Sequence, residues 1–110
     1  MKTKSNFLEK VPVRNVSEWT ADEKGIVTLN IHNKGLFNKI AQTLFKKPKI
    51  SYVHLDEMGS FIWPLIDGKI NIINIGKAVE EHFGEKANPL YERLAKYLKI
   101  LESYNFIKFV

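Results

Sequence analysis

The side chains that most often perform catalysis or bind metals are few and scattered in this chain of 110 residues. Its three histidines, His32, His54 and His82, lie far apart and share no spacing typical of metal ligands. The chain contains no cysteine, which excludes disulfides, thiolate metal sites and cysteine nucleophiles. We therefore expect the protein to use no metal and no other cofactor.

The acidic and hydroxyl side chains also lack the arrangements used in acid–base or nucleophilic catalysis. Asp56 and Glu57 are adjacent, and adjacent residues of a helix do not face each other. Asp56 is better explained as a helix N-cap. The pair Gly59-Ser60 is not part of a G-x-S-x-G motif, and no glycine-rich phosphate-binding motif is present. These observations predict that the protein is not an enzyme.

The positive charge is concentrated in one segment. Residues 34–49 contain five lysines and no acidic residue, which equals the formal net charge of +5 of the whole chain. A basic surplus indicates an acidic partner. Lys39, Lys46 and Lys47 are therefore candidates for docking on an acidic surface of a partner protein, although a solvated helix face would explain them equally well.

No segment has the features of a membrane or export sequence. No apolar run approaches the ~20 residues of a transmembrane helix. The first ten residues include basic side chains but neither the apolar stretch nor the cleavage site of a signal peptide. We expect a cytoplasmic protein with no membrane partner.

The first half of the chain has the pattern of strands interrupted by one helix. Residues 11–16 and 26–31 are rich in Val and Ile and are separated by a polar turn at 22–25, which predicts a hairpin within 11–31. Apolar residues at three-to-four spacing predict a basic amphipathic helix over about 35–47. Residues 50–55 have the pattern of a third strand.

The second half predicts three helices, over about 56–66, 71–84 and 88–105. Asp56 and Asn71 are expected N-caps, and Gly84 is expected to end the second helix. Pro89 is expected at the first position of the third helix, and Asn105 in the left-handed conformation after it. The apolar stripe of this third helix consists of Leu90, Leu94, Tyr97, Leu98, Leu101 and Tyr104.

This order of elements predicts a single α+β domain spanning residues 1–110. We expect a winged-helix-like fold, in which a three-stranded N-terminal antiparallel sheet is followed by a three-helix bundle, with an extra helix inserted before the third strand. The helices at 71–84 and 88–105 also have helix-turn-helix spacing.

Nucleic-acid binding is one function compatible with this fold. A basic protein with helix-turn-helix spacing could be a winged-helix transcription regulator, and the third helix offers Arg93, Lys96 and Lys99 to phosphates. Residues 51–110, however, contain more acidic than basic side chains, and carboxylates repel the phosphate backbone. Nucleic-acid binding is therefore the alternative hypothesis.

Capture of a peptide by strand addition is the other function. A strand at 50–55 that leads directly into a helix is expected at a sheet edge, where unpaired backbone groups accept another strand. If the third helix packs beside this edge, Arg93, Lys96 and Tyr97 would provide charge and an aromatic wall, although Tyr97 could equally be a core residue. The candidate edge residues, which could also pair in a homodimer, are Ser51, Tyr52, Val53, His54 and Leu55.

Several motifs of the second half resemble the PqqD-like family in their order and spacing. The first is Leu55-Asp56-Glu57-Met58-Gly59-Ser60-Phe61-Ile62-Trp63, followed by the turn Asp67-Gly68 and the helix start Asn71-Ile72-x-x-Ile75. Tyr91-Glu92-Arg93-Leu94 and the pair Phe106-Ile107 resemble the last helix of the family and its closing apolar residues.

The resemblance implies a noncatalytic peptide chaperone, the recognition element for a ribosomally made and post-translationally modified peptide. Such a protein binds the leader of the precursor peptide as an added strand, here between residues 51–55 and 89–104. It presents the peptide to a modifying enzyme, typically a radical S-adenosylmethionine (SAM) enzyme, and the name-giving members serve synthesis of pyrroloquinoline quinone.

Two features depart from the family pattern. Residues 34–49 stand where the name-giving members have a short connection, and Asn71 and Asn74 replace Thr and Glu at a helix start. We therefore expect a peptide other than the precursor of pyrroloquinoline quinone. A third hypothesis is a structural subunit whose basic helix docks on an acidic enzyme.

Overall fold

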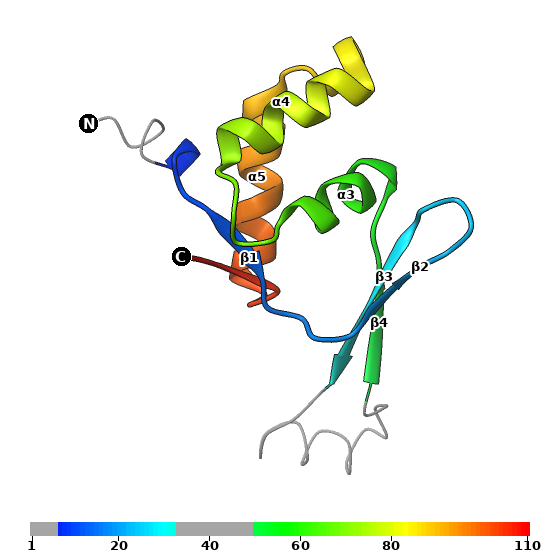
Figure 1. The fold of residues 1–110 in the computed structure, drawn as a ribbon. Coiled ribbons are helices and arrows are strands. Elements are labelled where there is room, and N and C mark those ends of the chain that lie inside the picture. The colour runs from blue at the N-terminus through cyan, green and yellow to red at the C-terminus, as the bar shows by residue number, and fades with distance from the viewer. Residues whose placement is uncertain (1–6, 33–49) are drawn as a thin grey trace.

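The computed structural model describes residues 7–32 and 50–110 (Figure 1). They form a mixed α+β fold with antiparallel strands and three helices, as predicted, but the strands make two sheets instead of the one expected. The helix expected over about 35–47, and with it Lys39, Lys46 and Lys47, lies outside the described residues.

A three-stranded antiparallel sheet has the order β2-β3-β4. Its strands are β2 (Trp19–Ala21), β3 (Val27–His32) and β4 (Ile50–His54). The turn between β2 and β3 lies at the expected position. Two hydrogen bonds hold it, in which Asp22 Oδ1 accepts the N–H groups of Lys24 and Ile26, both at 2.9 Å. The polar turn therefore closes the hairpin locally.

The first predicted strand has a different partner from the one expected. β1 (Pro12–Arg14) pairs with β5 (Ile107–Phe109) in a second, two-stranded antiparallel sheet. The prediction that residues 11–16 pair with residues 26–31 was therefore wrong, and the strand at the C-terminus was not predicted. The physical reason is that the chain reverses after the last helix and brings its final apolar run to β1, a nonlocal pairing that short-range patterns do not contain.

Three helices follow β4 in the chain and lie together on one side of the molecule (Figure 1). Asp56 caps the first by accepting the N–H of Gly59 at 2.7 Å, and Asn71 caps the second by accepting the N–H of Asn74 at 3.0 Å. The helices and their 3-10 extensions are α3 (Glu57–Ile62), η1 (Trp63–Leu65), α4 (Ile72–Phe83), η2 (Gly84–Ala87) and α5 (Leu90–Ser103).

The boundaries of α5 differ from the expectations in two details. Gly84 ends α4 as expected, with a φ of 63°, and Asn105 follows α5 in the expected left-handed region, with a φ of 64°. Pro89 has an extended backbone and precedes α5 instead of occupying its first position. Tyr104 is 64% exposed and stacks on Phe106, because α5 ends at Ser103, so its place in the buried stripe was a wrong prediction.

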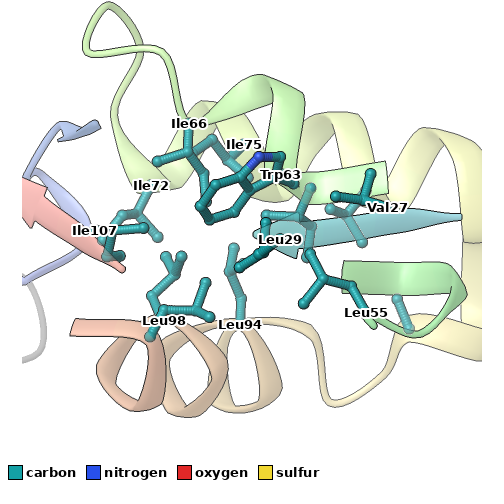
Figure 2. Packing of buried hydrophobic residues seen from close by; sticks show 14 residues of the cluster. Val27, Leu29, Leu55, Trp63, Ile66, Ile72, Ile75, Leu94, Leu98 and Ile107 are labelled. Atoms are coloured by element: carbon teal, nitrogen blue, oxygen red, sulfur yellow. The ribbon is translucent and has the colours of Figure 1, made fainter. Parts of the chain in front are cut away.

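A single apolar cluster joins the two sheets to the helices (Figure 2). Trp63 is fully buried at its centre, and Leu29 of β3 and Leu98 of α5 are buried beside it. Leu55, at the end of β4, and Leu94 of α5 point into the same cluster (Figure 2). This shared core fixes the position of β4 relative to α5.

Candidate peptide-binding edge

The strand β4 lies at one edge of its sheet. β3 pairs with one side of β4, and no other strand of residues 7–32 and 50–110 pairs with its outer side. An edge strand offers backbone N–H and C=O groups to an incoming strand. The position of β4 in the sheet order therefore fits strand addition.

Two hydrogen bonds define which backbone groups of β4 face outward. The N–H of Leu55 donates to the carbonyl of Val27 at 2.9 Å, so the backbone of Leu55 faces β3. The N–H of Asn30 donates to the carbonyl of Glu18 at 3.0 Å, so even-numbered residues of β3 face β2. In an antiparallel ladder alternate residues face the same neighbour. The backbone groups of Ile50, Tyr52 and His54 therefore face the outer edge of β4.

The side chains of β4 alternate between solvent and the core. Tyr52 is 61% exposed, whereas Val53 packs against the core and Leu55 is buried. His54 is exposed and its Nδ1 lies 2.8 Å from the hydroxyl of Thr28 on β3, which holds the imidazole over the outer face of the sheet. An added strand would therefore meet a polar and aromatic surface on one side and the margin of the core on the other.

The buried hydroxyl of Ser60 attaches α3 to the end of the β3–β4 ladder. It accepts the N–H of Val27 at 2.8 Å and lies 3.3 Å from the carbonyl of Leu55, to which it donates. Ser60 is 4% exposed, and its hydroxyl satisfies two backbone groups that would otherwise be buried without partners. It thus has a structural role and positions β4.

Tyr97 connects α5 to the same region. A Cβ added at Gly59 would lie 2.5 Å from the Tyr97 hydroxyl oxygen, so the glycine is what allows this close approach. The hydroxyl is buried and has no hydrogen-bond partner in the described part of the chain. Burial, and to a smaller extent the carboxylate of Asp56, raises the pKa of Tyr97, which keeps the hydroxyl neutral.

Arg93 and Lys96 do not join Tyr97 in a single wall. The guanidinium of Arg93 donates to the carbonyl of Lys86 at 2.8 Å, which directs it toward η2. Lys96 is exposed on the solvent side of α5. Among these three candidates Tyr97 is the one that approaches Gly59 of α3, the helix that directly follows β4, with Arg93 and Lys96 on neighbouring parts of the helix surface.

Two residues beside this site were missed in the sequence. Ile100 and Tyr104 follow Tyr97 by three and seven positions, so they lie on the same side of α5. They are 45% and 64% exposed. Tyr104 was assigned to the buried stripe because its spacing fits, and Ile100 was not considered. The available signal for Ile100 was an apolar side chain on the flank of that stripe.

Residues 7–32 and 50–110 contain no group of three or more His, Cys, Asp or Glu side chains that could hold a metal ion. Within these ranges no helix combines the length and apolar character needed to cross a membrane.

Comparison with known proteins identifies the family. The model of the family described as coenzyme PQQ synthesis protein D (PqqD) matches residues 25–107. Neither the curated proteins nor the solved structures gave a match. Members of this family are noncatalytic proteins that bind ribosomally made precursor peptides and partner with radical SAM enzymes. This match covers most of the chain, and the chain therefore belongs to the PqqD family.

Proposed function

We propose that this protein captures the leader of a precursor peptide as an extra strand at the outer edge of β4 and presents it to a modifying enzyme in the cytoplasm. The radical SAM partners of the PqqD family make such an enzyme the first candidate. The protein itself performs no chemistry in this proposal. Its contribution is to hold the peptide in an extended conformation.

The observation that carries the proposal is the direction of the backbone groups at the β4 edge. Ile50, Tyr52 and His54 turn their N–H and C=O groups away from β3, as the hydrogen bonds of Leu55 and Asn30 indicate. Each backbone hydrogen bond to a bound strand contributes a net ~0.5–1.5 kcal/mol. Ordering a disordered leader opposes this gain, so side-chain contacts must add to the affinity.

The flank of α5 supplies those contacts in the proposed complex. The hydroxyl of Tyr97 lies against Gly59 of α3, the helix directly after β4, and the exposed Ile100 and Tyr104 extend the same side of α5. An added strand places alternate side chains on the two faces of the sheet. Those on the core side would pack against this flank, while those on the other side would meet Tyr52 and His54.

The lysines of residues 34–49 complete the proposal. Lys39, Lys46 and Lys47 would dock on an acidic surface of the modifying enzyme, and the concentration of charge in the sequence supports this assignment. Reversing the charge at the three positions should weaken capture of the enzyme in a pull-down while leaving the affinity for the peptide unchanged. Loss of peptide affinity as well would contradict the separation of the two sites.

Titration of the ¹⁵N-labelled protein with the leader of a candidate precursor tests the peptide site. The proposal requires chemical-shift changes concentrated in residues 50–55 and along α5. Changes that leave both segments unaffected would refute it. Salt-sensitive binding to random duplex DNA, with no response to peptide, would favour the nucleic-acid alternative.

A further inference from the structure

The sheet β2-β3-β4 has a second edge, which is formed by β2 and lies opposite the candidate peptide site. β3 pairs with one side of β2, and the other side meets no strand in the part of the chain that the structure describes. The carbonyl of Glu18 accepts the N–H of Asn30 at 3.0 Å, so the even-numbered residues of β2 face β3. The backbone groups of Trp19 and Ala21 therefore face outward.

The residues of this edge carry no charge. Thr20 and Ala21 are exposed, and Trp19 is half-buried. Natural edge strands commonly carry a lysine, a proline or an inward-pointing charge that prevents pairing with another chain. β2 has none of these side chains, so only its short length opposes pairing.

The sequence of β2 is self-complementary when two copies pair antiparallel with Thr20 next to the two-fold axis. Trp19 of each copy then lies opposite Ala21 of the other, and each such pair exchanges its backbone hydrogen bonds. The small side chain of Ala21 leaves room for the indole of Trp19, which packs edge-on against Trp63 with ring centroids 6.3 Å apart. The two Thr20 side chains face each other, a cross-strand pair that stabilises antiparallel sheets.

The acidic residues that flank β2 are engaged within their own subunit. This register places Glu18 opposite Asp22 of the second copy, and like charges in that arrangement repel. Glu18 Oε1, however, lies 2.9 Å from His32 Nε2 on β3. Asp22 Oδ1 accepts two N–H groups of the turn. Both carboxylates therefore reach toward β3 or the turn, and away from the outer edge.

We propose that this edge is a homodimer interface, in which two copies join through β2 into one antiparallel sheet with three strands from each copy. The outermost strand at each end of this sheet is β4, so both candidate peptide-binding edges stay free. The inference is independent of the proposed function, because pairing at β2 requires no peptide. Since β2 has three residues, we expect a dimer that dissociates on dilution.

Sedimentation equilibrium of the full chain tests the interface without any ligand. The average mass should rise toward twice the monomer value as the protein concentration approaches ~1 mM. Ala21→Pro removes an outward N–H, a change that edge strands tolerate, and should raise the dissociation constant of the dimer about tenfold. The matched control is Tyr52→Pro, which removes an outward N–H at the other edge of the same sheet and should leave the dimer unchanged.

A mass that stays at the monomer value over the whole concentration range would refute the interface. A dimer that Tyr52→Pro weakens as much as Ala21→Pro, or more, would show that β2 is not the specific contact. If circular dichroism shows that Ala21→Pro does not fold, Ala21→Lys replaces it, because a lysine on the edge also opposes pairing. A dimer that survives substitution of Ala21 would overturn the proposal.

Peptide binding by the same variants keeps the two proposals apart. Ala21→Pro should bind a leader peptide with unchanged affinity, because β4 lies on the opposite side of the sheet. If the wild-type protein dimerises through β2 but binds no peptide, strand capture fails and the interface stands.

Discussion

At the scale of single residues, two tyrosines of the candidate site have opposite environments. Tyr52 is exposed and its backbone faces the open edge of the sheet. Tyr97 is largely buried, and its hydroxyl has no hydrogen-bond partner within the described residues. Substitutions at the two positions therefore separate the contribution of the β4 backbone from that of the packing beneath it.

Tyr52→Pro should weaken peptide binding more than Tyr52→Ala. Proline removes the N–H that faces the incoming strand, and edge strands tolerate proline where that N–H does not join the internal ladder. We expect the affinity for the peptide to fall about tenfold in the proline variant, because one hydrogen bond is lost and the neighbouring pair is disturbed. The affinity should fall less in the alanine variant. Fluorescence anisotropy with a labelled peptide measures both, and equal losses would contradict backbone pairing at this residue.

Tyr97 makes the stability of the protein sensitive to alkaline pH. Burial raises the pKa of its hydroxyl above the ordinary value of 10.0. Above that ordinary value the unfolded chain releases a proton that the folded chain keeps, so the free energy of unfolding falls by up to about 1.4 kcal/mol per pH unit. The fall continues until the pH reaches the raised pKa of the folded state.

Urea denaturation between about pH 9.5 and about pH 11 should show this loss of stability. Tyr97→Phe should reduce the pH dependence, because the variant has no proton to lose at this position. Tyr104→Phe is the control, since its ring is exposed. If the free energy of unfolding of Tyr97→Phe falls with pH as steeply as that of the wild-type protein, the hydroxyl is solvated in the folded protein.

At the scale of the elements, the junction between β4 and α3 positions the candidate site. Ser60 bridges Val27 of β3 and Leu55 at the end of β4, while Asp56 caps α3. Gly59 leaves room for the Tyr97 hydroxyl, so α5 approaches the same junction. Four elements, β3, β4, α3 and α5, thus meet around residues 55–60.

Ser60→Ala should lower the free energy of unfolding by about 1–3 kcal/mol. The substitution leaves the N–H of Val27 buried without its partner and removes the tie between α3 and the ladder. Chemical denaturation measures the change. Ser103→Ala, which removes an exposed hydroxyl bonded within α5, is expected to cost much less, and similar losses for the two variants would contradict a special role for Ser60.

At the scale of the whole molecule, the C-terminal strand closes the fold. β5 pairs with β1, and its Ile107 is 1% exposed in the core shared by both sheets and the helices. The three-stranded sheet and β4 depend on that same core through Leu29 and Leu55. The C-terminus therefore supports the candidate edge from a distance.

Ile107→Ala should destabilise the protein by about 2–5 kcal/mol, since it leaves a cavity in this core. The exposed neighbour Lys108 provides the control, and Lys108→Ala should have little effect. Thermal unfolding followed by circular dichroism compares the two variants. If Ile107→Ala unfolds with the wild-type midpoint, β5 does not contribute to the common core.

The features predictable from the sequence were those whose physical cause is local. Asp56 and Asn71 cap helices because their side chains reach backbone N–H groups three residues away. The turn that begins at Asp22 closes within a few residues for the same reason. The motifs around Leu55–Trp63 likewise indicated the family that the comparison identified.

The tertiary structure decided what depends on contacts between distant residues. Residues 11–16 carry a strand pattern that fits several partners, and only the reversal after α5 assigns β1 to β5. The direction of the Tyr52 backbone likewise follows from the register of β4 with β3. The exposure of Ile100 and Tyr104 follows from where α5 packs and where it ends. The sequence by itself thus determined the local elements and the family, because caps, turns and motifs act over a few residues. Which edge is open and which side chains flank it depends on long-range pairing and burial, which no short segment encodes.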